Sequence, residues 1–361
     1  MKPWLDQQEA DAAAAAVLSG WVAQGPRVRE FEQAFADYIG VPHAIAVSSC
    51  TAALHLCLIA AGIAQGDEVV VPSLSFIATA NAVRHAGARP IFADVDPVTL
   101  NLTPDTVAAV VTTRTKAVIV VDQAGIPCDL DAFTPLGFTV IEDAACAAGS
   151  TYKGRPVGAG ARLAAYSFHP RKLLTTGEGG MITTDDPDLA ARLRRLREHA
   201  MSISAAERHT VAQPVLERYL ETGYNYRMTD VQAAIGLVQL DKLPAMVQQR
   251  RLLAARYRRA FPTLPTAQDP PYGTTNYQSL WVRLDHVDQE HALKVLARRG
   301  IAARRGIMAS HLEPAYAGHR RAPLPITEQA TRRTLILPLF HQMTQQEQNM
   351  VIAAVQEVAD G

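Results

Sequence analysis

The segment AIAVSSCTAALHLCLIAAGI, residues 44–63, sets the fold class of this 361-residue chain. Its first four residues are a short apolar run, which is typical of a strand buried on both faces of a sheet. Small polar residues then interrupt the run, and a helical pattern follows from Ala52 to Ile63. A strand that passes through a short turn into a helix is the repeating unit of α/β proteins.

The same alternation continues along the chain. Further strands are predicted at residues 68–71, 90–93, 117–121, 138–142, 163–168 and 181–184. Helices are expected at residues 78–85 and 103–110, but no long helix separates the last two strands. An opening helix is expected from Asp6, as its N-cap, to about Gly20. This order predicts a doubly wound, mostly parallel sheet with helices on both faces.

The C-terminal part of the chain has a different organisation. Long helical patterns cover residues 186–200 and 229–261, and a segment rich in proline, residues 261–276, is the best candidate for a linker. A strand at residues 279–284 and helices at 290–298 and 344–358 follow. We therefore expect a large α/β domain, residues 1–245, and a smaller α+β domain, residues 246–361.

Composition argues against several classes of partner. The 35 basic residues equal the 35 acidic residues, so the zero net charge gives no sign of nucleic-acid binding. The cluster Arg192, Arg194, Arg195 and Arg197 alternates with leucine at helical spacing and is interpreted as a solvated helix face.

Cysteine usage and hydropathy predict where the protein works. The cysteines at 50, 57, 128 and 146 form no C-x-x-C pair, so neither a metal site nor a disulfide framework is expected. The first residues lack the pattern of a signal peptide, and no apolar run is long enough to span a bilayer. We expect a cytoplasmic protein with no membrane partner.

Three strand ends carry unusual polar residues, and in open α/β sheets ligands bind at such ends. Residues 48–54, SSCTAAL, offer small hydroxyl groups and free backbone N–H groups at a helix start, where an anion binds well. Simple N-capping by Ser49 or Thr51 explains the same residues. Asp143 follows a buried strand, where a carboxylate needs a cationic partner or serves as a helix cap.

The third strand end is residues 167–181, SFHPRKLLTTGEGGM. Lys172 lies between an apolar strand and a turn with three glycines, where burial is expected to lower the pKa of its amine toward nucleophilic use. Most lysines are only solvated surface charges, so the context carries more weight than the residue type.

Together these segments resemble the DegT–StrS family of sugar aminotransferases. Four blocks share its pattern besides the one around Lys172: EDAA at 142–145, SSCTAALHL at 48–56, GYNYRMTDVQAAIGL at 223–237 and VPSLSF at 71–76. The segment HLEPAY at 311–316 is similar to a block near the substrate. The likeness covers essentially the whole chain in the correct order. It implies fold type I of the enzymes that depend on pyridoxal 5'-phosphate (PLP), acting as a homodimer.

The resemblance also implies a role for individual residues. Lys172 is the expected catalytic residue and Schiff-base lysine, and Asp143 pairs with the ring nitrogen of PLP. The other implied cofactor contacts are Thr51, Ala52 and Ser167 at the phosphate, Phe76 stacked on the ring, Cys146 near the phenolic oxygen, and Asn225 at the neighbouring subunit's phosphate. Arg227, His311 and Tyr316 are candidates for the substrate region. Phe76 could instead be an ordinary core residue. His311 and Tyr316 could be structural, and a surface histidine with no role is the default for His311.

Three residues depart from the family pattern. Cys146 stands where a glutamine is usual, Cys50 replaces a glycine beside the phosphate turn, and Ala124 occupies a position where an aromatic residue is common. The Cys50 replacement requires a backbone there without positive φ. These changes are expected to reshape the pocket.

The expected function is transfer of an amino group, with L-glutamate as donor, to a nucleotide-linked ketosugar in amino-deoxysugar biosynthesis. Pyridoxamine 5'-phosphate is the expected intermediate form of the cofactor. A keto-cyclitol acceptor and a non-catalytic, PLP-binding regulatory protein are alternatives. Relatives that carry histidine instead of lysine perform dehydration, and this chain keeps Lys172. A nicotinamide-dependent oxidoreductase has weak support, because Gly154, Gly158 and Gly160 have the wrong spacing.

Overall fold

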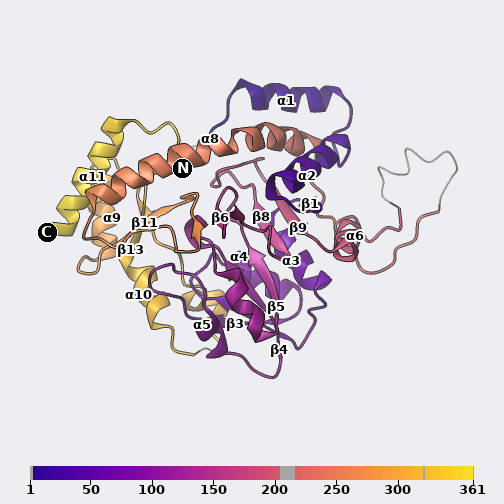
Figure 1. The fold of residues 1–361 in the computed structure, drawn as a ribbon, viewed down its shortest axis with the longest axis horizontal. Coiled ribbons are helices and arrows are strands. Elements are labelled where there is room, and N and C mark those ends of the chain that lie inside the picture. The colour runs from indigo at the N-terminus through magenta and orange to yellow at the C-terminus, as the bar shows by residue number, and fades with distance from the viewer. Residues whose placement is uncertain (1–2, 204–215, 320–321, 361) are drawn as a thin grey trace.

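A computed structural model describes residues 3–203, 216–319 and 322–360 of the chain (Figure 1). Its centre is a seven-stranded sheet in the order β1-β9-β8-β5-β4-β2-β3. The strands are β1 His43–Val47, β2 Glu68–Pro72, β3 Arg89–Ala93, β4 Thr115–Val121, β5 Thr139–Asp143, β8 Ala164–Ser167 and β9 Gly180–Thr184. The pairs among β2, β3, β4, β5 and β8 are parallel, whereas β9 runs antiparallel to both of its neighbours. The predicted mostly parallel sheet is confirmed.

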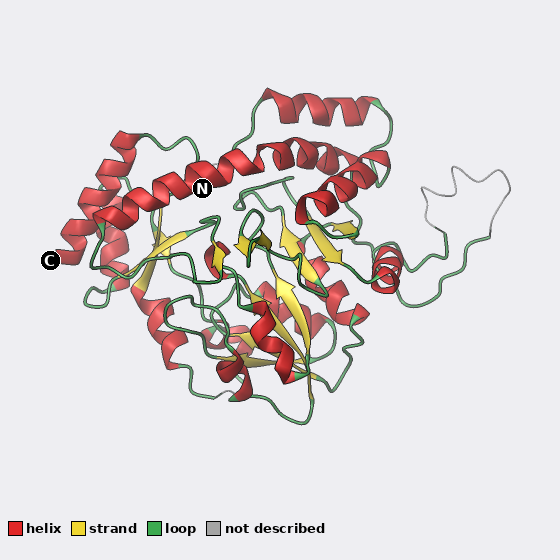
Figure 2. Cartoon of the chain, viewed as in Figure 1, coloured by secondary structure: helices red, strands yellow, loops and turns green. Residues whose placement is uncertain are grey.

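Helices cover both faces of this sheet (Figure 2). On one face, α3 Cys50–Ala60, α4 Ala78–His85 and α6 Pro187–Leu196 pack apolar side chains against β1, β2 and β4. On the other face, α2 Pro26–Ile39 and α8 Asp230–Ala260 enclose a second apolar cluster, together with the short α5 Pro104–Ala108. The strand ends therefore lie between two covered faces, so the residues that leave those ends can meet a ligand at the sheet edge.

The N-terminal helix is fixed to the long helix α8. Asp6 caps α1 Gln7–Leu18 through a capping box with Glu9, as the sequence predicts for Asp6. Lys242 on α8 binds Glu9 at 2.8 Å, and Gln239 donates to the same carboxylate at 2.7 Å. Figure 1 shows α1 lying along α8. Helix α2, which begins with a proline after Gly25, was not predicted from the sequence.

A smaller unit follows α8. Its sheet has the order β11-β13-β12, with strands β11 Leu280–Arg283, β13 Thr334–Leu337 and β12 Arg304–Arg305. Its helices are α9 Gln289–Arg298, α10 Pro325–Arg333 and α11 Gln345–Asp360. Leu253, Ala254 and Tyr257 of α8 belong to the apolar core of this unit. The proposed division after residue 245 stays a prediction, and that position lies inside the continuous helix α8.

The predicted linker is only partly irregular. Within residues 261–276, β10 Gly273–Thr274 pairs with β6 Thr151–Tyr152, which also pairs with β7 Arg155–Pro156. This three-stranded sheet ties the segment to the large unit.

The interpretation of the arginine cluster on α6 as a solvated face is wrong. Arg197 is only 5% exposed, and it forms an ion pair with Glu32 and donates to the carbonyl oxygen of Ala46 at 2.7 Å. Arg192 binds Glu221 at 2.8 Å. Among the described residues, no helix is both long and apolar enough to cross a membrane.

Candidate active site

The Lys172 side chain lies in a loop between β8 and β9, at the carboxyl end of the sheet. Its Nζ donates a hydrogen bond to Cys146 Sγ at 3.1 Å, and the residue is half-buried. Asp143, the last residue of the neighbouring strand β5, is close enough to affect the charge of Lys172. The structure therefore brings together Lys172 and two residues of the 142–146 segment, all of which were predicted from the sequence.

The loop that carries Lys172 is fixed by side chains from other elements. Gln278 accepts a hydrogen bond from the backbone N–H of Leu173 at 3.0 Å and donates to the carbonyl of Arg171 at 2.5 Å. Thr175 donates to the carbonyl of Phe168 at 2.8 Å. Gln278 was not predicted, because a buried glutamine beside an apolar strand carries no local signal of a partner 107 residues away.

The pKa of Lys172 differs from the expectation. Burial alone lowers the pKa of the ammonium group, as predicted. The Cys146 sulfur raises it through charge and a hydrogen bond, and Cys50 and Asp143 raise it further. The net pKa is raised, so the prediction of a lowered value is wrong for the residues present here.

Asp143 is a buried carboxylate held by two hydrogen bonds. Thr79 Oγ1, on α4, donates to it at 2.9 Å, and the backbone N–H of Ala145 donates at 3.2 Å. Cys50 Sγ lies 4.0 Å away. Burial raises the pKa of Asp143, whereas these hydrogen bonds and the Lys172 charge act in the opposite direction. Thr79 was not predicted, since it follows the Phe76 block as an ordinary helical residue.

Glu142 faces the opposite side of the sheet from Asp143, because adjacent residues of a strand alternate. It is buried, its Oε2 has no hydrogen-bond partner among the described residues, and burial raises its pKa to about 7. It also raises the pKa of the buried Asp122, whose own burial acts in the same direction. Two carboxyl groups that interact in this way favour a shared proton.

The turn before α3 is shaped by close backbone packing. Ser49 caps the helix, since its Oγ accepts from the N–H of Ala52 at 3.1 Å, which confirms the capping interpretation for this residue. A side chain at Gly180 would meet the Ser49 backbone at 2.6 Å and the Cys50 nitrogen at 2.7 Å. Ser167 pairs with Gly180 across β8 and β9. Thus Ser167 and the helix start with Thr51 and Ala52 lie at one edge, and Cys50 avoids positive φ, as predicted.

Phe76 is 68% exposed, so the alternative of an ordinary core phenylalanine is wrong. Its carbonyl oxygen accepts from the N–H of Thr79 at 3.2 Å, and Thr79 in turn binds Asp143. Thr79 therefore contacts both the backbone of Phe76 and the carboxylate of Asp143. Ala124, by contrast, is buried at positive φ, 59°, and leaves no large side chain at its position.

Asn225 and Arg227 lie in a segment that borders the α3 turn. The carbonyl of Tyr226 accepts from the N–H of Ser48 at 2.7 Å. Asn225 is exposed and pairs through its backbone with Glu198, while Arg227 lies 3.8 Å from the Glu198 carboxylate. The Arg227 contact supports its loop, and the Asn225 side chain remains accessible to another chain.

His311 and Tyr316 are packed side chains. His311 Nδ1 lies 2.5 Å from Ser73 Oγ and its Nε2 lies 3.5 Å from Glu328, so the alternative of a surface histidine is wrong. Tyr316 is buried, donates to Asn81 at 2.7 Å and packs edge to face on Phe92. These contacts support the structural interpretation of both residues.

Residues 3–356 match the DegT/DnrJ/EryC1/StrS aminotransferase family. The chain belongs to this family. SpsC, a spore coat polysaccharide biosynthesis protein of Bacillus subtilis (strain 168), is 38% identical over 374 residues, which cover 99% of this chain and 96% of the relative. The family is PLP-dependent, and the chain is therefore a PLP-dependent aminotransferase.

Solved structures of this family have the same fold. A putative sugar aminotransferase from Streptococcus pneumoniae in its PMP form is 27% identical with a TM-score of 0.94, and the match covers 99% of this chain and 98% of that chain. DesI, solved in the presence of its TDP-sugar product, is 34% identical with a TM-score of 0.89, and the match covers 99% and 91% of the two chains.

The residues present fit PLP on structural grounds. A buried carboxylate such as Asp143 needs a cation, and a protonated pyridine ring supplies one. The close approach of Gly180 leaves the start of α3 free of side chains from β9 at a place that suits a phosphate. When bound, the cofactor supplies an electron sink for the carbon that loses or gains a proton.

Proposed function

We propose that this aminotransferase moves an amino group from L-glutamate to a nucleotide-linked ketosugar in amino-deoxysugar biosynthesis. The family and its sugar aminotransferase members support the sugar as acceptor. The TDP-sugar product in the DesI structure supports a nucleotide-linked form, and the polysaccharide role in the name of SpsC supports the biosynthetic setting.

The observation that carries this proposal is the contact of Lys172 with Cys146, next to Asp143. Lys172 would hold the cofactor and, once released by the amino donor, move a proton at its Nζ. Asp143 would keep its charge opposite the ring nitrogen. Thr51, Ala52 and Ser167 would bind the phosphate, Phe76 would stack on the ring, and Cys146 would lie near the phenolic oxygen.

The active site is proposed to be shared within a homodimer. Asn225 is exposed beside the α3 turn, where its side chain would reach the phosphate of a neighbouring subunit. Large apolar side chains are exposed on nearby segments, namely Trp21, Val22, Tyr219 and Leu220. Exposed apolar groups of this kind are typical of protein interfaces. Four free cysteines accord with the proposed cytoplasmic location.

The first test is the absorption spectrum of the PLP-loaded protein before and after addition of L-glutamate. We expect a yellow band from the lysine-bound cofactor, which glutamate converts to a pyridoxamine-type band. Lys172→Ala should lack the yellow band and turnover, whereas Lys294→Ala, which removes an exposed lysine on α9, should retain both. A PLP-loaded protein that does not respond to any amino donor would contradict amino transfer.

The acceptor is tested separately. Protein whose cofactor has been converted by glutamate to the pyridoxamine form is mixed with a panel of nucleotide-linked ketosugars and free keto-cyclitols. Return of the yellow band with a nucleotide-linked sugar supports the proposal. Return with cyclitols alone would replace the proposed acceptor by a cyclitol while leaving amino transfer intact.

A further inference from the structure

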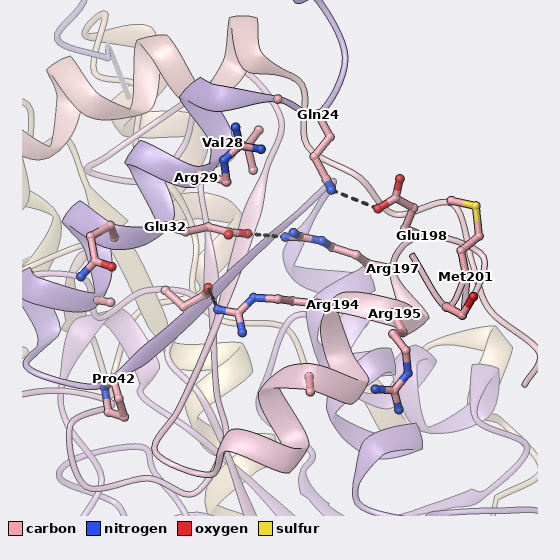
Figure 3. Close-up of a pocket in the computed structure, with 16 residues that line it drawn as sticks. Gln24, Val28, Arg29, Glu32, Pro42, Arg194, Arg195, Arg197, Glu198 and Met201 are labelled. Carbon is pink, nitrogen blue, oxygen red and sulfur yellow. Dashed lines mark hydrogen bonds and ion pairs between the residues drawn. The ribbon is translucent and has the colours of Figure 1, made fainter. Parts of the chain in front are cut away.

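A cationic groove lies between α2 and α6, outside the set of residues around Lys172 (Figure 3). Its volume is about 590 Å³, which is large enough for a small ligand. Its floor contains Ala36 and Ala44, and its walls carry the charged residues Arg29, Glu32, Arg194, Arg195, Arg197 and Glu198. We call this site the arginine groove.

Acidic partners are too few for the arginines of this groove. Glu32 binds Arg197, and Glu198 pairs with Arg227, which is not part of the lining. Among the described residues, Arg29, Arg194 and Arg195 form no ion pair; Arg194 donates only to the carbonyl of Ala44, at 3.4 Å. The groove therefore keeps an excess of positive charge.

Burial makes this excess costly. Arg194 is half-buried, and burial lowers the pKa of its guanidinium group even though Glu32 is near. The Nε atoms of Arg195 and Arg197 are buried without a hydrogen-bond partner among the described residues, and Gln24 Oε1 is in the same condition. Buried polar atoms normally have a partner, so the described residues leave the side chains around the groove incompletely satisfied.

Figure 3 shows how these side chains are arranged. Arg197 reaches Glu32 across the groove, and Gln24 reaches Glu198 at its edge. Arg29 and Arg194 come from the two opposite helices, on either side of the Arg197–Glu32 pair. A ligand between the helices would therefore meet guanidinium groups from both walls.

We propose that the arginine groove binds the phosphate or diphosphate group of a small molecule. Guanidinium groups match phosphate oxygens in charge and in bidentate geometry, and several of them together favour a ligand with more than one negative charge. This inference does not rest on amino transfer, because the lining residues include none of the residues proposed to bind PLP.

The test is calorimetric titration of PLP-loaded protein with inorganic pyrophosphate and with inorganic phosphate at low ionic strength. PLP fills the proposed phosphate site at α3, and the effect of arginine substitutions in the groove shows whether uptake takes place there. We expect saturable binding to the wild type that weakens as salt is added, since exposed charges are screened. Arg29→Gln and Arg194→Gln should each weaken binding roughly tenfold or more.

Two controls separate this site from other causes. Arg298→Gln and Lys294→Ala each remove an exposed cation on α9, and both variants should bind pyrophosphate as the wild type does. Arg29 is exposed, and its side chain makes no hydrogen bond with a described residue, so Arg29→Gln tests the proposal even if Arg194→Gln fails to fold.

Absence of pyrophosphate and phosphate binding, or equal binding by the wild type and Arg29→Gln, would overturn the proposal. Light scattering of the double variant Arg29→Gln/Arg194→Gln measures whether the protein remains a dimer. Loss of the dimer in this variant, together with no binding of either anion by the wild type, would show that the groove accepts an acidic group of a second copy. That result would refute the small-molecule site.

Discussion

The Cys146 sulfur contacts the Lys172 amine, so removal of the sulfur should change the pKa of that amine. The sulfur raises the pKa of Lys172, while burial lowers it. We expect cofactor-free Cys146→Ala protein to present a reactive, neutral amine at lower pH than the wild type does. Labelling with a small amine reagent across pH, with mass spectrometry of the Lys172 peptide, measures this. Cys128→Ala is the control, and an unchanged or upward shift would contradict the prediction.

Asp143 supplies a charge, and its neighbour Thr79 supplies a hydrogen bond to that charge. Asp143→Asn is expected to lower kcat for amino transfer roughly 100-fold or more, because a preorganised charge is lost from a buried site. Thr79→Val keeps the carboxylate and should cost less. Steady-state rates with glutamate measure both losses. Wild-type turnover by Asp143→Asn would exclude a role for this carboxylate at the ring.

Glu142 is expected to make the stability depend on pH. Its folded-state pKa is raised from 4.5 to about 7 by burial. Between these values the folded protein keeps a proton that the unfolded chain has released, so stability falls as pH rises through this range. Glu142→Gln removes this effect. Between pH 4 and pH 8 the free energy of unfolding of this variant should therefore rise, relative to that of the wild type, by up to roughly 3 kcal/mol.

Urea unfolding at the two pH values measures this difference in the free energy of unfolding. Glu290→Gln, an exposed substitution on α9, is the control and should follow the wild type. A Glu142→Gln variant with the same pH dependence as the wild type would show that Glu142 ionises normally.

At the scale of elements, the sequence predicted what depends on local pattern. The seven strands of the main sheet are buried apolar runs and lie within two residues of their predicted bounds. Arg197 was misinterpreted because helical spacing does not reveal Glu32, which lies 165 residues away. Lys172 itself was predicted, but the direction of its pKa shift depends on Cys146, a tertiary contact. Family likeness supplied the role that residue type alone could not.

Strand β9 approaches the turn before α3 so closely at Gly180 that an added methyl group should disturb this turn. Gly180→Ala would place a Cβ at 2.6 Å from the Ser49 backbone. Since backbone must move to relieve this contact, we expect weaker PLP binding and a lower melting temperature. Gly318→Ala is the control, because nothing lies within 4 Å of its Cβ position. Fluorescence titration with PLP measures the affinity, and wild-type affinity in Gly180→Ala would show that the turn adapts.

At the scale of the whole molecule, a shared active site predicts complementation between inactive chains. Lys172→Ala and Asn225→Ala are each expected to lose most activity. In a mixed dimer, one site would combine the intact lysine of one chain with the intact asparagine of the other. Unfolding and refolding an equal mixture should restore about a quarter of wild-type activity. No gain over the separate variants would place Asn225 outside the partner's site.

The helix α8 belongs to two cores at once, since its start packs with α2 and its end with the small sheet. This has a consequence for modularity. A chimera that exchanges the small unit with a relative at residue 245 would join two half-helices from different parents, and each core would receive side chains selected for another. Exchange is expected to succeed only when the crossover lies beyond Ala260 and the surface of α8 is matched, so this helix limits recombination within the family.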